Sequence, residues 1–454
     1  MFVAFHTHRV VSPRHTALGL AEARSLLHRG GEIMQASRVR AMMLSPLGKK
    51  TAGYSAALVL NALLGIAVYG LLTRLLPVEE FGTYSFIFAL FVFSGMFFDF
   101  GFSPAGARLM AIAANEQQQR RTATVLLLAS AILGIFYVLF IALASLVVDG
   151  LLHPGAGAVL LLVAPLTVVF PMQEMLMSMC QGSSRMALLS LLLIAPRLLL
   201  LFVLATVAAS GITLTQITAA TMVCIGVSVL AGSALMKPRL ADVRRNAKTL
   251  IVEVREFGRE LYLGRIVDGL TTGLDKILIS VFHGMTPVGY YSIAMTMCSP
   301  IGMGSKALSQ SAYRSFTNQV RIPTRILVTS LLLSLAGAMF ILLAGSTLVP
   351  LFFTDSYHAS LSVLPLLAVG AGLAGANHTF HSFLAARRQG RSLRILSIAT
   401  SSVNVLLNLV LIPFLAMTGA ALAFITTYLL NIVMNIHFYR KLVGSSAMHE
   451  GNGQ

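Results

Sequence analysis

The chain has 454 residues, of which 56% are apolar and only 11% are charged. Soluble domains average about 45–50% apolar and about 25% charged residues, so this composition excludes an ordinary soluble protein and indicates a membrane protein. The net charge of +17 would fit nucleic-acid binding, but the Lys and Arg residues follow the positive-inside rule. We therefore expect no nucleic-acid partner.

In chain order, twelve segments are long and apolar enough to cross the membrane. A transmembrane helix needs about 20 apolar residues to cross about 30 Å of hydrocarbon, because every backbone polar group in lipid must be paired. The fold class is therefore predicted to be all-α and integral to the membrane. The twelve predicted spans lie near residues 52–74, 82–104, 122–147, 156–178, 186–208, 213–236, 262–283, 287–310, 326–352, 360–384, 393–415 and 419–438.

The basic residues predict the orientation of these spans. If the N-terminus is cytoplasmic, the outer loops hold only Arg74, and four basic residues lie within spans: Arg197, Arg265, Lys276 and Lys306. The other 28 of the 33 Lys and Arg residues fall in cytoplasmic loops and tails. We therefore expect both termini in the cytoplasm.

The first 51 residues are basic and lack the apolar stretch and small-residue cleavage site of a signal peptide. Two interpretations are open. The segment is a cytoplasmic tail that lies on anionic lipid headgroups, or translation starts later, at Met34, Met42 or Met43.

No residue pattern points to a metal, a cofactor or catalysis. Cys180, Cys224 and Cys298 stand singly, without a His at metal-ligand spacing, which predicts buried thiols. The only Gly-Lys pair, Gly48-Lys49, lacks the upstream glycine of a Walker A motif, so ATP hydrolysis is not expected.

One phrase of the sequence occurs twice. A segment similar to residues 81–101, FGTYSFIFALFVFSGMFFDFG, occurs 207 positions later. A nearly constant offset in three regions predicts a duplicated six-helix unit. The matched pairs are Gly82 and Gly289, Tyr84 and Tyr291, Ser85 and Ser292, Gly95 and Gly302, Met96 and Met303, Asp99 and Lys306, Asn61 and Asp268, and, at an offset of 208, Gln181-Gly182 and Gln389-Gly390, and Gly211 and Gly419.

Because six helices separate the copies, both bundles have the same orientation, as in the parallel repeats of secondary transporters, whose substrate site lies between the halves. The shared Gly-x-Tyr-Ser pattern is interpreted as a hairpin turn with an interfacial aromatic residue. The predicted organisation is a basic N-terminal segment (1–51), a six-helix bundle (52–236), a basic cytoplasmic linker (237–261), a second six-helix bundle (262–440) and a tail (441–454).

Arg197 is the most exceptional charge, because it lies eleven residues from either end of its predicted span and directly after Pro196. A central Arg costs about 2.5–3.5 kcal/mol on insertion scales, and about 16 Å of helix separates it from each end. We therefore expect Arg197 to face a hydrated lumen or a carboxylate, with a buried ion pair that fixes helix packing as the alternative.

The predicted seventh span, LYLGRIVDGLTTGLDKILISVF, carries four charges. In one continuous helix, Asp268 and Asp275 lie within about 20° of each other, with Arg265 on the same side. This polar stripe is expected to line a cavity, although an Arg265–Asp268 pair would neutralise part of it, and Lys276 is the fourth charge of the span.

Asp99 and Lys306 occupy matching positions in the two repeats, so they are candidates for a gate between the halves, or are separately solvated. Glu174 is a further candidate for ion coupling. Asn residues spaced four apart, Asn404 with Asn408 and Asn431 with Asn435, predict hydrogen bonds between helices.

Four sequence runs, RLLPVEEFGTYSFIFAL, FDFGFSPAGARLMA, LDKILISVFHG and TPVGYYSIAM, resemble the Wzx-type polysaccharide flippases of the multidrug/oligosaccharidyl-lipid/polysaccharide exporter superfamily. The family runs Leu-Gly-Pro-Glu-Glu-Phe-Gly-x-Tyr-Ser, Ala-Asp-Phe-Gly and Leu-Asp-Arg/Lys-hydrophobic-Leu-Ile fall here on Leu76 to Ser85 (without the first Gly), Asp99 to Gly101 and Leu274 to Ile279.

The resemblance implies that the chain moves an undecaprenyl-pyrophosphate-linked oligosaccharide across the bacterial inner membrane by alternating access, for O-antigen, capsule or exopolysaccharide synthesis. Under it, Arg197, Arg265, Lys276 and Lys306 bind the substrate. Asp268, Asp275, Asp99 and Glu174 serve in proton or sodium coupling or as counter-ions. Membrane lipid, the polysaccharide polymerase and chain-length proteins are the further partners.

Two other functions stay open. A cation-coupled multidrug exporter of the same superfamily also has twelve spans, but four basic lumen residues count against a cationic substrate. A membrane polymerase or ligase would present a long outer loop, and the outer loops predicted here are short. We therefore expect a transporter rather than an enzyme.

Overall fold

The computed structural model describes residues 46–152, 155–207, 211–269, 271, 273–317 and 319–451, without the side chains of 46–52, 151–152, 263, 268, 314 and 445–451. The chain divides into two compact units, Met1–Ala52 and Gly53–Gln454, and the description below concerns the second. The expectations for residues 1–45, including the alternative starts, lie outside the described residues.

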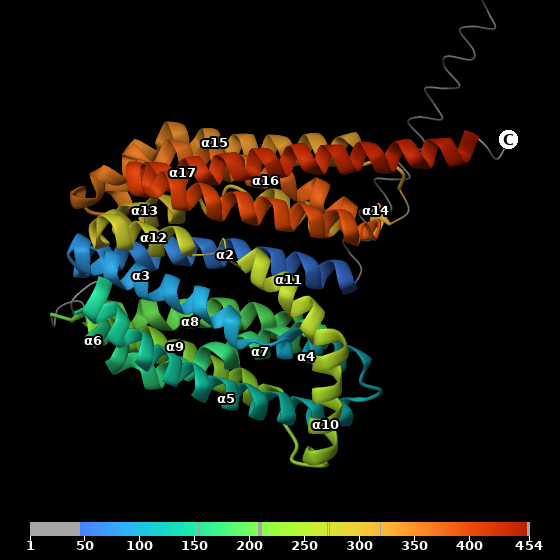
Figure 1. Ribbon diagram of the computed structural model, residues 1–454, viewed down its shortest axis with the longest axis horizontal. Helices are drawn as coiled ribbons and strands as arrows, with labels where there is room; N and C mark the ends of the chain where they lie inside the picture. Colours follow the sequence, from blue (N-terminus) through green and yellow to red (C-terminus); the bar gives the residue numbers. More distant parts are fainter. Residues whose placement is uncertain are drawn as a thin grey trace, which may run out of the picture. The chain divides into compact units, whose positions relative to one another are not determined.

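The first helix group comprises α2 to α9. Side chains set several of its helix starts: Asn115 accepts a hydrogen bond from the Gln118 amide ahead of α5, and Thr213 and Gln216 form a capping box ahead of α9. The lower part of Figure 1 shows most of this group. Its members are α2 (Pro46–Leu75), α3 (Val78–Gly95), α4 (Phe102–Ile112), α5 (Glu116–Val147), α6 (Ala156–Val163), α7 (Val169–Gly182), α8 (Met186–Val207) and α9 (Leu214–Leu235).

The second helix group comprises α12 to α17 and occupies the upper part of Figure 1. Its last helix is interrupted at Ala416 (φ 48°, ψ −130°), shortly after Pro413, so α17 contains the two predicted spans 393–415 and 419–438. The members are α12 (Leu274–His283), α13 (Met285–Cys298), α14 (Met303–Phe316), α15 (Thr324–Phe352), α16 (Leu364–Ala386) and α17 (Gly390–Gly451).

Within the described residues, eight helices are long and apolar enough to cross a membrane, or nine with the bent pair Asp355–Ser362 and Leu364–Ala386, and none of these residues forms a strand. The twelve predicted segments account for the same helices. α17 carries two of them, and the seventh and eighth each consist of two shorter helices. The predicted all-α membrane fold is therefore confirmed.

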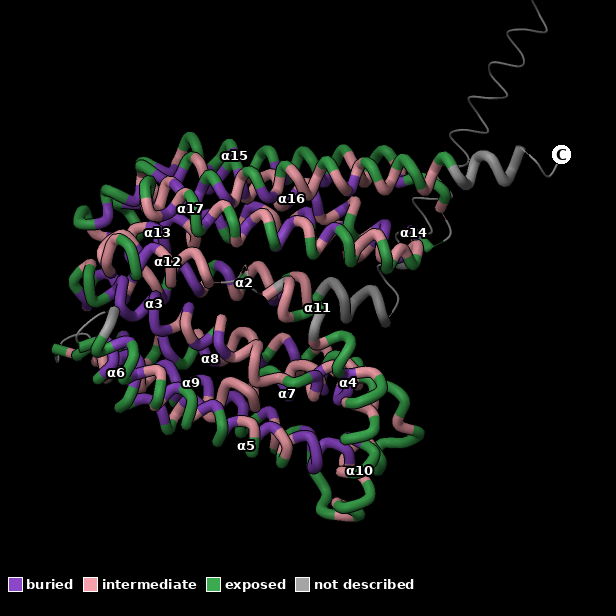
Figure 2. The backbone as a smooth tube through the Cα atoms, viewed as in Figure 1, coloured by how far each residue is buried: buried purple, intermediate pink, exposed green. Residues whose placement is uncertain are grey.

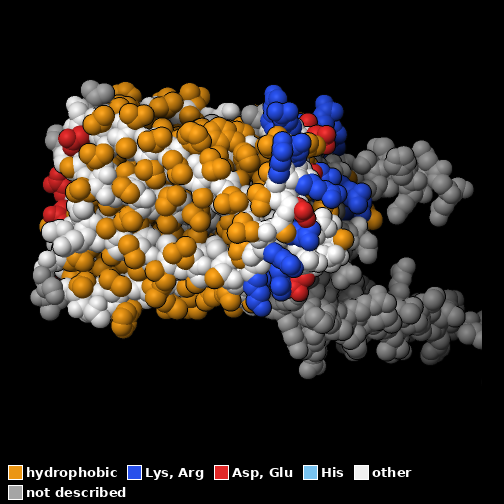
Figure 3. Space-filling view, turned by 90° about the horizontal axis from the view of Figure 1, so that it is seen from below, with side chains coloured by type: hydrophobic (Ala, Val, Ile, Leu, Met, Phe, Trp, Pro, Cys, Tyr) orange, Lys and Arg blue, Asp and Glu red, His pale blue; other side chains and the backbone are white. Residues whose placement is uncertain are grey.

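The outer surface has the character expected of a lipid-facing protein. In Figure 2 the exposed positions follow the outward sides of the helices, and many of them are large apolar residues, such as Phe202 at 71% and Leu343 at 75% exposure. Figure 3 shows hydrophobic side chains over most of one face, with Lys and Arg gathered at one end. A wide apolar belt bounded by basic residues fits a bilayer.

The linker between the groups is largely helical. α10 (Val243–Glu253) packs on α4 and α5, continues through a π-helical segment (Val254–Gly258) and leads into α11 (Arg259–Gly269). Ion pairs hold both ends of α10: Arg121 with Asp242, and Arg108 with Glu253 at 2.6 Å. The basic linker is thus fastened to the first helix group.

The seventh span corrects one expectation. It is not continuous, because α11 ends at Gly269 and α12 begins at Leu274, after Gly273 with φ +84°. A left-handed residue cannot continue an α-helix, so the argument that placed Asp268 and Asp275 on one helical stripe fails. The Asp268 side chain lies outside the described residues.

The repeated phrase corrects a second expectation. Gly82 and Gly289 lie inside α3 and α13 rather than in hairpin turns. These helices pack on each other, and a Cβ on Gly289 would stand 2.9 Å from the carbonyl oxygen of Val78. Tyr84 and Tyr291 are buried, at 3% and 1% exposure, so they are not interfacial aromatics. The glycines allow the close approach of two backbones.

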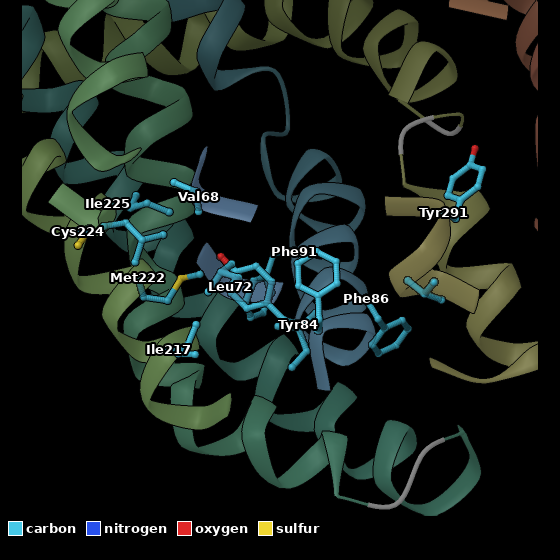
Figure 4. Close-up of a cluster of buried hydrophobic side chains, with 14 of the residues drawn as sticks. Val68, Leu72, Tyr84, Phe86, Phe91, Ile217, Met222, Cys224, Ile225 and Tyr291 are labelled. Atoms are coloured by element: carbon cyan, nitrogen blue, oxygen red, sulfur yellow. The ribbon is translucent and has the colours of Figure 1, made fainter. Parts of the chain in front are cut away.

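Figure 4 shows the packing around Tyr84. Leu72 from α2, Phe91 from α3 and Met222 from α9 belong to the same buried apolar cluster, and the Tyr84 hydroxyl lies 3.2 Å from Thr221 Oγ1 on α9. Between membrane-spanning helices, such side chains stabilise the bundle through van der Waals packing rather than through removal from water. The cluster ties α3, which contacts the second group, firmly to the first group.

Candidate functional site

A cavity of about 1300 Å³ lies between the two helix groups. Its wall includes Asn61 and Arg197 from the first group, and Tyr291 and Asn404 from the second. It extends to Ser103 and Ser397, near the starts of α4 and α17, while the packed pair α3 and α13 lies at the other end. Most polar candidates converge on this volume, so it is the candidate functional site.

Six of the eight predicted site residues line the cavity: Asp99, Glu174, Arg197, Arg265, Asp275 and Lys276. Lys306 is not among the lining residues, and the side chain of Asp268 is not described. A wall with this many ionisable groups in a membrane protein indicates a hydrated space.

Arg197 projects from the middle of α8 into the cavity. Its Nη1 donates a hydrogen bond to the carbonyl oxygen of Asn61 on α2. One turn further along α2, a Cβ on Gly65 would lie 2.8 Å from the same nitrogen, so the glycine leaves room for the guanidinium. The described partner of Arg197 is a backbone carbonyl rather than the carboxylate that the sequence offered as an alternative.

Arg265 on α11 connects to two carboxylates of the first group. Its guanidinium lies 3.6 Å from Asp99 and 3.4 Å from Glu174, and Asp99 also accepts a hydrogen bond from the Ser103 amide at 3.0 Å. The sequence reasoning offered Lys306 as the partner of Asp99. The structure instead pairs Asp99 with Arg265, because α11 contacts the short 3-10 helix Met96–Phe98, which ends directly before Asp99.

Nearby contacts hold α11 in place. The Tyr262 hydroxyl donates to the carbonyl oxygen of Phe97 at 2.8 Å, and the backbones at Gly101 and Gly258 approach closely enough that neither position leaves room for a Cβ. Arg265 is therefore positioned by helix packing as well as by charge. Exposed ion pairs alone contribute only about 0–1 kcal/mol.

Asp275 and Lys276 occupy the first turn of α12. The Tyr291 hydroxyl donates to Asp275 Oδ2 at 2.7 Å, and Asp275 Oδ1 accepts from the Lys276 amide at 2.8 Å. Tyr291, from the repeated phrase, thus orients a cavity carboxylate. Lys276 lines the same wall and forms none of the ion pairs among the described residues.

The asparagines behave as the sequence predicted, but two of them also line the cavity. Asn377 on α16 bonds Asn431 and Asn435 on α17 at 2.5 and 2.6 Å, which confirms hydrogen bonds between helices. Asn404 donates to Thr427 across the interruption of α17 at 3.1 Å. The sequence reasoning missed Asn404 and Asn431 as cavity residues, because spacing alone does not show which side of a helix faces water.

Solved structures show which class of protein has this fold. The chain matches an inward-facing multidrug resistance MATE family transporter of the MOP superfamily with a TM-score of 0.67 at 14% identity, covering 85% of this chain and 96% of that one. It matches the lipid II flippase MurJ in an inward closed conformation with a TM-score of 0.66 at 13% sequence identity, covering 87% of this chain and 90% of that one. A MOP superfamily transporter from Pyrococcus furiosus matches with a TM-score of 0.61 at 13% sequence identity, covering 90% of this chain and 98% of that one.

The fold is therefore that of the MOP transporters. Residues 47–313, more than half of the chain, match the family described as "Polysaccharide biosynthesis protein", and the chain belongs to this family. No curated protein matches the sequence. Family and fold together confirm the resemblance to the polysaccharide branch, and the long apolar helices define a multi-pass membrane protein.

Proposed function

We propose that this protein moves undecaprenyl-pyrophosphate-linked oligosaccharide repeat units from the cytoplasmic to the outer leaflet of the bacterial inner membrane. The pyrophosphate and the sugar pass through the cavity while the lipid tail stays in the bilayer. The positive-inside rule supports a cytoplasmic location for the basic end of the molecule, and under this proposal the substrate enters the cavity from that side.

The single observation that carries the proposal is the charge balance inside the cavity. Its carboxylates have partners, since Asp99 and Glu174 face Arg265 and Asp275 accepts from Tyr291. Arg197 and Lys276 form no ion pair with any described carboxylate. Two unpaired cations in a hydrated cavity favour an anion such as pyrophosphate, because charge-assisted hydrogen bonds to phosphate oxygens are strong.

Family membership supports the same substrate class, and the similar MurJ structure is that of a lipid II flippase. The runner-up is export of cationic drugs, since MATE transporters share the fold. The two unpaired cations oppose it, because a cationic substrate would meet like charges. The Pyrococcus furiosus transporter is reported with reversed pocket polarity, so the fold accommodates pockets of either sign.

Coupling to a proton or sodium gradient would use the carboxylates Asp99, Glu174, Asp268 or Asp275, and Lys306 would contact substrate in another state of the cycle. Direct contact with the polysaccharide polymerase and chain-length proteins is part of the same proposal. Each of these roles stays a prediction.

The experiment is the sidedness of lipid-linked repeat units in cells depleted of the protein. A membrane-impermeant glycosidase or lectin is added to spheroplasts, with cells expressing the wild type as the control. Repeat units that accumulate but stay protected support flipping. Repeat units that remain accessible outside would assign the protein to drug export or to another step.

A further inference from the structure

The cavity has two chemically different walls. Five of the six described ionisable candidates come from α7, α8, α11 and α12, and the sixth, Asp99, lies in the connection between α3 and α4. The wall formed by α17 carries no Asp, Glu, Lys or Arg among the described residues, and most of its side chains are uncharged polar or aromatic groups. Those that matter here are Ser397, Ser401, Asn404, Thr427, Tyr428 and Asn431.

The α17 wall is regular along the helix. Ser397, Ser401 and Asn404 follow each other at intervals of four and three residues, which places them on one side of the first part of α17. Thr427 and Asn431 do the same on the second part, beyond Ala416. Both parts of the interrupted helix therefore turn a polar side to the same volume.

The repeat shows which positions of the two walls correspond. In this region the matched glycines and glutamines are offset by 208 residues, which sets Asn404 against Pro196, next to Arg197. Equivalent spans of the two repeats thus present a cation on one side of the cavity and a carboxamide on the other.

Several polar groups of this wall are available to a ligand. The hydroxyls of Ser397, Ser401 and Tyr428 take part in none of the hydrogen bonds between described residues. Phe424 and Tyr428 lie edge to face with ring centroids 4.9 Å apart and both line the cavity. Asn404 and Asn431, by contrast, are held by their bonds to Thr427 and Asn377.

We propose that the α17 wall recognises the saccharide, while Arg197 and the opposite wall hold the pyrophosphate. Sugar hydroxyls are uncharged donors and acceptors, which carboxamides and hydroxyls match in both roles. Aromatic faces pack against the apolar side of a pyranose ring. Fixed asparagines and free hydroxyls on the same wall give an orienting surface. Loss of a matched hydrogen bond discriminates strongly between substrates.

This inference rests on the proposed function, and the test separates the two. Purified full-length protein is titrated with two ligands: undecaprenyl pyrophosphate, and lipid-linked repeat units extracted from cells depleted of the protein. The variants are the double substitution Ser401→Ala with Tyr428→Phe, and Arg197→Gln. The matched control is Ser402→Ala, since Ser402 is the exposed neighbour of Ser401 on the same helix and does not line the cavity.

We expect the double substitution to weaken binding of the repeat unit about tenfold, which corresponds to the loss of two modest hydrogen bonds. The affinity for undecaprenyl pyrophosphate should stay within about twofold of the wild-type affinity. Arg197→Gln weakens both ligands alike, and Ser402→Ala changes neither. Equal loss for both ligands in the double variant, or no loss for either, overturns the assignment of the α17 wall. A wild type that binds neither lipid overturns the proposed function and this inference with it.

Discussion

Gly82 of α3 and Gly289 of α13, equivalent residues of the two repeats, meet at the end of the cavity opposite the basic end of the molecule. A Cβ on Gly289 would stand 3.5 Å from the backbone nitrogen of Gly82, and a Cβ on Gly82 would overlap the carbonyl oxygen of Met285. The repeated sequence therefore supplies the close contact between α3 and α13 at Gly82 and Gly289, which is called the seam between the two helix groups below.

The first prediction concerns this seam. Gly82→Ala must displace the backbone of α13, and overpacking of this kind costs about 1–3 kcal/mol. We expect a lower melting temperature of the purified protein and weaker closure of this end. The control is Gly53→Ala, because nothing lies within 4 Å of a Cβ there, and an alanine inside a helix is tolerated or slightly stabilising. Equal melting temperatures for both variants would contradict the seam.

The second prediction concerns Arg197. Replacing it by Ala removes a charge-assisted interaction with the anionic substrate, and we expect transport to fall at least about tenfold with unchanged membrane insertion. Arg74→Ala is the control, since Arg74 is exposed and does not line the cavity. Polymer output is measured by gel, and normal output from Arg197→Ala removes this residue from the site.

The third prediction concerns the pairing of Asp99. Asp99→Lys places a second cation beside Arg265 and is expected to lower transport several-fold, since like charges repel at this distance. Adding Arg265→Asp with Glu174→Gln restores opposite charges without placing the new carboxylate beside that of Glu174, and transport should return to within about twofold of the Glu174→Gln single variant. The comparison is Asp99→Lys with Lys306→Asp. If that double variant restores transport instead, Asp99 pairs with Lys306 during transport, as the sequence suggested, and the assignment of Arg265 as its partner is contradicted.

The fourth prediction concerns the break between α11 and α12. Gly273 has φ +84°, a conformation that costs any other L-residue about 1–2 kcal/mol, so Gly273→Ala should lower the melting temperature by a few degrees. Gly264→Ala, at a helical position with open space around it, should not. A Gly273→Ala protein as stable as wild type would show that the break does not depend on the left-handed residue.

The sequence alone predicted the membrane class, the spans and the duplicated offset, because hydropathy and repetition are local signals. It also predicted the Asp, Glu, Lys and Arg residues of the cavity wall, since a charge in a membrane span is costly wherever it lies. It did not predict the interruption after Gly269, because Gly273 sits inside an apolar run that reads as one helix. The partner of Asp99 and the role of Gly82 depend on which helices pack together, which spacing within one segment does not show.

The most direct test of the central claim is transbilayer movement in proteoliposomes that contain only this protein. Extracted lipid-linked repeat units are placed in both leaflets, and the fraction reached by an added glycosidase is followed over time. We predict that wild type exposes the inner-leaflet pool, whereas Arg197→Ala and protein-free vesicles leave about half of the units protected. Equal protection in all three preparations would contradict flipping as the activity of this chain.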